Sequence, residues 1–152
     1  STSATATATA SFSVLNYTSY GYIVNVVGNP PAAGSYTLAG ITTDPTDPNS
    51  TSQQGVEQFG INLVRNIDFL GVGNDLGADP AQVPDGTFSF GSVTTNYSVP
   101  GRFHYVPGET IASAPKSSGQ TDYTISYIVN VSTDSGGGQY TGSQTIVCTG
   151  TY

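Results

Sequence analysis

The 152-residue chain contains few side chains that could perform acid–base, nucleophilic or metal chemistry. It has one histidine, His104, and a single histidine cannot build a histidine-based metal centre. A Ser-His-Asp triad would have to use His104 as its base, and no Gly-x-Ser-x-Gly motif accompanies it. In the alternating segment 102–105, we expect His104 to face solvent, opposite Phe103 and Tyr105.

The single cysteine and the glutamates form no catalytic pattern either. Cys148 alternates with Ile146 toward the expected core, so we interpret it as a buried, unreactive thiol with no cysteine partner for a disulfide. Glycoside hydrolysis needs paired carboxylates, and no motif pairs Glu57 or Glu109 with another acid. The sequence therefore predicts neither an enzyme nor a protein with a cofactor.

Two acidic loops are weak candidates for calcium binding, because calcium takes carboxylate and carbonyl oxygens as ligands. The candidate ligands are Asp44 and Asp47 in the first loop, and Asp75, Asp79 and Asp85 in the second. Neither loop has the spacing of an EF-hand, and aspartate beside proline or glycine is also common in ordinary turns. Ordinary turns are the favoured interpretation.

Four Asn-x-Ser/Thr triplets are candidate glycosylation sites: Asn16, Asn49, Asn96 and Asn130. The chain contains 39 serine and threonine residues, and such a composition produces these triplets by chance. The triplets alone therefore carry little information about function.

The charge balance excludes nucleic-acid binding. Three basic residues stand against ten acidic ones, which gives a net charge of −7, and binding to phosphates needs many Lys and Arg side chains. The longest apolar runs, such as residues 22–27, are far shorter than the roughly 20 residues of a membrane span. The chain begins with Ser1 and a short polar stretch, so we expect a secreted protein, outside the cell or on its surface.

Alternation of apolar and polar residues, the pattern of a half-buried β-strand, recurs along most of the chain. The clearest cases are 123–131 and 140–152, and further strands are expected at 20–27, 35–42, 56–64, 87–93, 102–106 and 109–113. About eight to ten strands at this spacing predict an all-β fold, either a β-sandwich or a closely related barrel. We expect an immunoglobulin-like or jelly-roll-like β-sandwich with an extended N-terminal strand. We expect a single domain over residues 15–152, preceded by an extension over residues 1–14.

A short internal repeat supports the sandwich. The sequence Tyr-Ile-Val-Asn-Val occurs at residues 22–26 and again at residues 127–131, and each copy is followed by a loop and a Gly-x-Tyr-Thr segment. We interpret each copy as the first strand of a β-hairpin, with the asparagine near the turn where its amide can bind loop backbone groups. Two such hairpins would occupy equivalent places in two sheets.

The amino terminus alternates with unusual regularity. Every odd position from 1 to 13 is Ser or Thr, and no Gly, Pro or charge interrupts the run. Its opposite face carries Ala4, Ala6, Ala8, Ala10, Phe12 and Val14. Fully extended, fourteen residues span roughly 46 Å at about 3.3 Å per residue, which is longer than a usual strand. Such a strand exposes an unprotected edge that soluble monomers normally block with Lys, Pro or a bulge.

Three interpretations of this segment remain open. The first is a strand donated to a neighbouring subunit, whose core would receive the alanine, phenylalanine and valine face. The second is a strand of the chain's own sandwich. The third is a disordered Ser/Thr/Ala leader over residues 1–10, followed by a first strand of the same domain over residues 11–15.

The segments 33–37 and 138–141, together with the run 145–152, resemble the Gly-x-Tyr and alternating-Thr endings of secreted bacterial β-sandwich surface proteins, such as spore-coat-U-like and fimbrial subunits. The resemblance implies an immunoglobulin-like sandwich, secretion and assembly on the cell surface, often by donation of an N-terminal strand. The chain lacks the disulfide that is common in such subunits, and residues 44–120 do not share the resemblance.

We therefore expect a structural subunit of an extracellular filament or pilus that polymerises through its N-terminal strand. Its partners would be copies of itself and, in addition, a host or neighbouring cell surface. The alternative is a monomeric secreted module that binds a glycan or mediates adhesion, in which exposed tyrosines stack on sugars.

Overall fold

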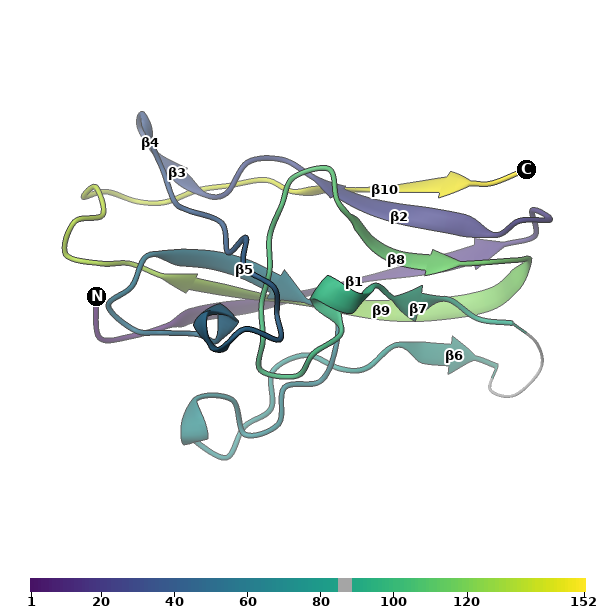
Figure 1. Cartoon of the computed structure of the whole chain (residues 1–152), viewed down its shortest axis with the longest axis horizontal. Helices are drawn as coiled ribbons and strands as arrows, with labels where there is room; N and C mark the ends of the chain where they lie inside the picture. Colours follow the sequence, from purple (N-terminus) through teal and green to yellow (C-terminus); the bar gives the residue numbers. More distant parts are fainter. Residues whose placement is uncertain (85–88) are drawn as a thin grey trace.

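The computed structural model describes residues 1–84 and 89–152, and the described elements are strands and short 3₁₀ helices (Figure 1). The strands are β1 (Ala6–Asn16), β2 (Tyr22–Val27), β3 (Ala32–Ala33), β4 (Tyr36–Thr37), β5 (Gln58–Asn62), β6 (Ala81–Val83), β7 (Ser92–Val93), β8 (Thr110–Ala114), β9 (Ser118–Asn130) and β10 (Thr145–Gly150). The 3₁₀ helices are η1 (Pro48–Ser50), η2 (Phe69–Gly71) and η3 (Thr95–Tyr97). The expectation of an all-β fold is confirmed.

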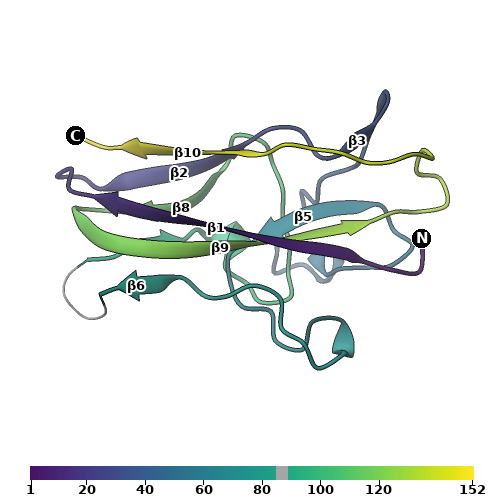
Figure 2. The same ribbon diagram turned by 180° about the vertical axis from the view of Figure 1, so that it is seen from behind.

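Two main antiparallel sheets make up the fold, an arrangement consistent with a β-sandwich. The first has the order β1-β9-β5, with β6 also paired to β9, and the second has the order β10-β2-β8-β7. A small third sheet pairs β3 with β4. The long strand β9 is the centre of the first sheet because it pairs with β1, β5 and β6 (Figure 2).

The main core contains side chains from both sheets. Tyr22, Val24 and Val26 of β2 belong to the same buried cluster as Tyr123 and Ile125 of β9. Because these residues are two positions apart along each strand, they share one face of their sheet, and this face is the inner one.

A second, smaller cluster lies on the opposite face of β9. Ile128 interrupts the polar parity of that strand, and it is fully buried with Ile41 and Phe103. Phe69 and Leu76 pack partly against this cluster. The segments that carry these residues therefore cover the outer face of the first sheet.

The repeated pentapeptide occupies one strand in each sheet, but the expected hairpins are wrong. The first copy lies in β2, whose partners are β10 and β8, and the second begins in β9, whose partners are β1, β5 and β6. The two Gly-x-Tyr-Thr segments meet each other instead: Tyr36 and Tyr140 form an edge-to-face pair at 6.4 Å, and Ala32 of β3 bridges Thr141. Residues adjacent in sequence were a poor guide to pairing here, because each strand lies between partners distant in the chain.

Several other segments differ from the expected strands. Of residues 35–42 only Tyr36–Thr37 form a strand, and of the described part of 87–93 only Ser92–Val93 do so. Residues 102–106 do not form a regular strand, and their sheet-like contacts are the isolated bridges of Arg102 to Thr51 and of His104 to Ile61. Conversely, β6 forms at residues where the sequence predicts no strand. β6 has only three residues, all exposed, and such a segment is too short for alternation to identify a strand.

Candidate functional site: the amino-terminal edge strand

The amino-terminal run forms β1, and in the single chain it pairs with its own β9. The register is continuous from Ala6 opposite Val129 to Val14 opposite Thr121, and it shifts between Val14 and Asn16. β1 extends across the expected domain boundary at residue 14. The single chain thus adopts the second of the three interpretations of this run.

The carboxyl-terminal half of β1 is anchored in the core of its own chain. The ring of Phe12 stacks on that of Tyr123 with centroids 5.0 Å apart and an angle of 20° between the planes. Val14 is only 7% exposed. Between them, the hydroxyl of Ser13 donates to Asp122 Oδ1 over 2.6 Å. This hydrogen bond, followed by one from Gln120, holds the pKa of the Asp122 carboxyl below its usual value.

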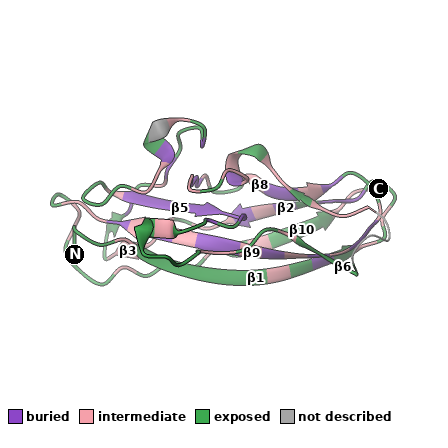
Figure 3. Ribbon diagram, turned by 90° about the horizontal axis from the view of Figure 1, so that it is seen from below, coloured by how far each residue is buried: buried purple, intermediate pink, exposed green. Residues whose placement is uncertain are grey.

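The amino-terminal half of β1 is held differently. Every residue from Ala6 to Ser11 is exposed, although each is paired with β9 (Figure 3). Ala6, Ala8 and Ala10 lie opposite Val129, Tyr127 and Ile125 and so share the inner face of the sheet. Because these side chains are exposed, backbone hydrogen bonds supply most of the stabilisation of this half.

The inner face is hollowed next to this strand. An open, mainly apolar depression of about 220 Å³ is lined by Ala4, Ala6, Val129 and Val131, with Ser1 and Thr5 at its border. Ala4 precedes the first residue of β1 and is itself exposed. The six residues predicted for polymerisation therefore separate into two buried or half-buried anchors, Phe12 and Val14, and four exposed alanines.

A buried polar network fixes the start of the strand. Thr5 Oγ1 donates to Asn130 Oδ1 over 2.6 Å, and Asn130 Nδ2 donates to Gln58 Oε1 over 2.9 Å and to Ser52 Oγ over 3.0 Å. Asn130 is 1% exposed. The sequence did not reveal this network, because it joins residues 125 positions apart.

Apart from the register shift near Asn16, the edge of β1 carries none of the features that usually prevent strand addition. Among the described strands, β1 pairs with β9 and β10 pairs with β2, so each strand ends its sheet. Residues 1–43 and 135–152, which include β1 and β10, contain no charged side chain. All thirteen charged residues lie between positions 44 and 134. Unpaired backbone groups on an uncharged edge favour pairing with another strand.

A tight turn connects β1 to β2. Asn16 Oδ1 accepts hydrogen bonds from the backbone N–H and the hydroxyl of Thr18, at 2.8 and 2.5 Å. Gly21 has a φ of +79°, and a Cβ there would lie 1.9 Å from the carbonyl oxygen of Ala114. Only glycine fits this position, so the turn is fixed by local contacts.

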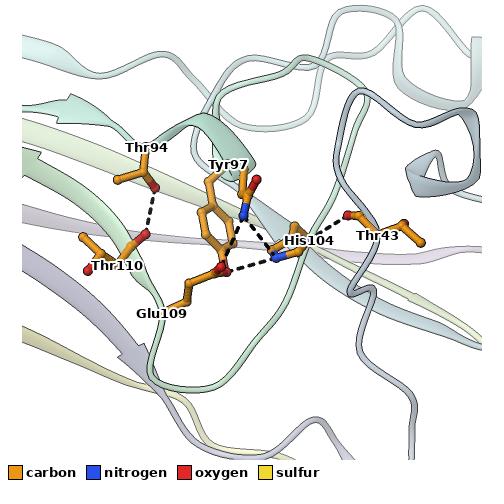
Figure 4. A network of polar contacts seen from close by, with 7 residues as sticks. Thr43, Thr94, Tyr97, His104, Glu109 and Thr110 are labelled. Atoms are coloured by element: carbon orange, nitrogen blue, oxygen red, sulfur yellow. Dashed lines mark hydrogen bonds and ion pairs between the residues drawn. The ribbon is translucent and has the colours of Figure 1, made fainter.

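His104 is buried rather than solvent-facing, which corrects the sequence-based expectation. It is 4% exposed, with Nδ1 2.9 Å from the carbonyl oxygen of Thr43 and Nε2 3.0 Å from Glu109 Oε2 (Figure 4). Each ring nitrogen therefore lies within hydrogen-bonding distance of an oxygen acceptor. The alternation could not reveal this, because loop 40–51 covers the outer side of segment 102–106.

The same carboxylate holds a buried tyrosine. The hydroxyl of Tyr97 donates to Glu109 Oε2 over 2.5 Å, and Asn96 Nδ2 donates to Glu109 Oε1 over 3.2 Å. Burial, followed by the hydrogen bond and the charge of Glu109, raises the pKa of Tyr97. With the hydrogen bond from Thr94 to the carbonyl of Thr110, these contacts fasten η3 to β8 and to the segment after η3 (Figure 4).

The aspartates considered for calcium are engaged in turns and in an ion pair. Asp44 Oδ1 accepts from the backbone and side chain of Thr46, and Asp47 Oδ1 accepts from the backbone of Asn49. Asp75 pairs with Arg65, and Asp79 accepts from the backbone N–H of Arg65. Asp85 lies outside the described residues. Within the described part of the chain, no three His, Cys, Asp or Glu side chains gather into a group that could hold a metal.

The four asparagines of the glycosylation triplets differ in accessibility. Asn49 is exposed, whereas Asn16 and Asn96 are half-buried and hydrogen-bonded. Asn130 is buried and its amide nitrogen already donates twice, so the folded chain offers no room for a glycan there. Asn25, the corresponding residue of the first copy of the repeat, donates to the carbonyl of Gly108, which lies outside the loop that follows β2.

Cys148 is exposed, which contradicts the prediction of a buried thiol. The parity was correct, since Cys148 lies opposite the buried Val24 of β2 and so shares its face of the sheet. Its position on the terminal strand β10 leaves it uncovered, because no described strand lies beyond it in that sheet. Partial burial still raises the pKa of its thiol.

No helix in the described ranges has the length and apolar character that a membrane crossing requires. When the chain is compared with protein-family models, with curated proteins and with solved structures, none of the three comparisons gives a match.

Proposed function

We propose that this protein is a structural subunit of an extracellular filament or pilus, joined to its neighbour by β1. The proposal includes secretion to the cell surface and the finer fold assignment, an immunoglobulin-like or jelly-roll-like sandwich. The chain would then be a surface subunit of the kind that the spore-coat-U-like and fimbrial resemblance implies.

One observation carries the proposal: the residues Ala6–Ser11 are fully paired with β9 and yet all exposed. Such a segment contributes little buried surface to its own chain, so it can leave β9 at a modest cost in free energy. It also lacks every charge or proline that would prevent it from pairing with another chain.

The mechanism is exchange of β1 between subunits. Each contact that β1 makes with β9 in the single chain, including the stacking of Phe12 on Tyr123, is available unchanged between a donor strand and a neighbour's β9. The turn around Thr18 would open to become an extended linker, and its local hydrogen bonds are the main loss. Domain swapping of identical elements has this energetic form.

Exchange in one direction generates a chain of subunits. Each subunit donates β1 to the next and accepts β1 from the previous one, and such a heterologous contact forms a filament unless the rotation closes a ring. The turn that would open lies at the end of the molecule opposite the N-terminus (Figure 1). Subunits would therefore be joined end to end.

Deletion of residues 1–10 tests the proposal. The shortened chain keeps Phe12 and Val14 and is expected to fold as a monomer that no longer forms filaments in electron micrographs. Deletion of residues 1–3 is the matched control, because it retains β1 and Thr5, and it should still assemble. Normal filaments from the chain without residues 1–10 would contradict the proposal.

The binding module remains a second candidate because three exposed tyrosines lie near one end of the sandwich. Tyr17 and Tyr20 in the turn and Tyr152 at the carboxyl terminus are 70%, 67% and 93% exposed. Thr151 Oγ1 donates to the carbonyl of Tyr20, which holds the turn and the carboxyl terminus together. Tyrosine rings in this arrangement can stack on sugars.

Affinity electrophoresis in gels that contain cellulose, chitin or xylan derivatives tests the second candidate. The binding module would be favoured over the filament subunit if a monomer of the wild-type chain is retarded in these gels. The retardation should be lost in Tyr17→Ala and in Tyr20→Ala, and it should be kept in the chain without residues 1–10.

A further inference from the structure

The two halves of β1 differ in how strongly they fix the register of this strand on β9. A strand whose faces repeat every two residues can shift by two along its partner and present the same side chains to the same faces. Residues 3–11 repeat in this way, with Ser or Thr at each odd position and Ala at each even one. This run alone therefore does not specify one position on β9.

The polar network at the start of β1 shares this ambiguity. Asn130 accepts a hydrogen bond from Thr5, which is opposite to it by continuation of the register. A shift of two residues in one direction would present Ser3 to Asn130, and a shift in the other direction would present Thr7. Each alternative offers a hydroxyl on the same face, so the network can form in all three registers.

The triplet Phe12-Ser13-Val14 favours one register of β1 on β9, whereas the run over residues 3–11 does not. Phe12 stacks on Tyr123, Ser13 donates to Asp122, and Val14 is buried opposite Thr121. A shift of two residues in either direction breaks the contacts of Phe12 and Val14, and in one direction it also puts Leu15 in the place of Ser13 beside Asp122. In the other direction Ser11 would take the place of Ser13, so Phe12 and Val14 carry most of the specificity. Either shift would also put phenylalanine in the place of valine, or valine in the place of phenylalanine, and protein cores tolerate such changes of volume poorly.

We propose that Phe12-Ser13-Val14 is the recognition element that sets the register of β1 on β9, and that the Ser/Thr/Ala run before it is register-neutral. The inference rests on the β1–β9 pairing, which the single chain contains and which the exchange in the proposed function would preserve. A neighbouring subunit would thus recognise the donor strand by this triplet. The Ser/Thr/Ala run would add backbone hydrogen bonds over a variable length.

Transplanting the triplet by two residues tests the inference. The double variant Ala10→Phe/Phe12→Val spells Phe-Ser-Val at positions 10–12, because position 11 is already serine. The register should shift so that position 10 lies opposite Tyr123, and residues 13 and 14 then join the turn. Lengthening a surface turn by two residues costs little free energy.

Disulfide trapping in a Cys148→Ser background shows which residue of β1 lies opposite Thr124 of β9. In the unmodified strand, Ser11 Oγ lies 3.5 Å from Thr124 Oγ1, so the pair Ser11→Cys/Thr124→Cys should cross-link. The pair Thr9→Cys/Thr124→Cys is diagonal in that register, at about 7–8 Å, and should cross-link poorly. In the transplanted variant the preference should reverse. Retention of the original preference by a folded transplant would overturn the inference.

Deletion of Ala8 and Thr9 provides a second test that leaves the triplet intact. If the triplet sets the register, the original Ser11 still cross-links to Thr124, and Ser3 replaces Thr5 beside Asn130. If Thr5 sets it, the original Ser11 cross-links to Ser126 instead, which would overturn the inference. The mass of the cross-linked product shows separately whether the bond lies within or between chains, so this result and that of the exchange are independent.

Discussion

At the residue scale, a few side chains hold the amino-terminal strand in place. Phe12, Ser13 and Val14 make the core contacts of β1, whereas Ala6, Ala8 and Ala10 remain exposed. The difference in burial predicts that substitutions in the two halves will have different effects on stability, because lost burial is the main source of large destabilisation.

Phe12→Ala should reduce the free energy of unfolding by about 2 kcal/mol, because it removes a half-buried ring and its stacking on Tyr123. Ser11→Ala, an exposed neighbour on the other face, should change it by less than about 0.5 kcal/mol. Urea denaturation followed by circular dichroism measures both. Equal effects of the two substitutions would contradict the assigned anchor.

The stability that Asp122 contributes through its contact with β1 depends on pH. Its folded pKa lies below its unfolded value, chiefly through the hydrogen bond from Ser13. Its contribution to stability is therefore complete above the unfolded pKa of about 4, and it is lost as the pH falls through the lower folded value.

The urea midpoint of the wild-type chain, compared with that of Asp122→Asn, should show this dependence. The wild-type advantage should shrink between about pH 5 and pH 2, while the other carboxylates cancel in the comparison. A constant difference over this range would show that Asp122 makes no such contribution.

At the element scale, the strands were more predictable than their partners. The cores of β2, β8, β9 and β10 follow from alternation alone, which is a local property of the sequence. The pairings were not predictable, since β2 lies between β10 and β8, and β9 lies between β1 and two other strands. The burial of His104 and the exposure of Cys148 were missed for the same reason: each depends on whether a distant segment covers the strand.

The turn between β1 and β2 is the element that controls exchange in the proposed mechanism. Thr18→Ala removes the hydroxyl whose single hydrogen is shared between Asn16 Oδ1 and the carbonyl oxygen of Gly21, which should destabilise the monomer by about 1 kcal/mol. Because the open form lacks this shared hydrogen bond in either variant, filament formation should become faster. Light scattering measures the rate, and Ser19→Ala, an exposed neighbour in the turn, is the control. A less stable monomer that assembles no faster would count against the turn as the hinge.

At the scale of the whole molecule, the charged residues and the edge strands β1 and β10 come from different parts of the sequence. The uncharged residues 1–43 and 135–152 supply β1 and β10, one edge strand of each main sheet, and the net charge of −7 comes entirely from residues 44–134. Copies of the chain therefore repel one another over a distance while their edges remain able to pair.

Salt should weaken this repulsion. Raising the ionic strength from about 0.01 M to about 0.15 M shortens the screening length from about 30 Å to about 8 Å, so filament formation should become faster without a change in the β1–β9 register. Sucrose at matched osmolality is the control. Slower assembly in salt would mean that attraction between charges, rather than strand exchange against repulsion, drives the association.

The most direct test of the account asks whether β1 of one chain pairs with β9 of another. Two full-length proteins in the Cys148→Ser background are mixed, one with Ser11→Cys and the other with Thr124→Cys, under assembly conditions and then mild oxidation. Positions 11 and 124 are opposite each other in the β1–β9 register, and in this mixture a disulfide between them can form only between chains. The account predicts a covalent dimer that contains one chain of each kind. Assembled filaments that yield no such dimer, while the double variant on one chain cross-links within itself, would contradict it.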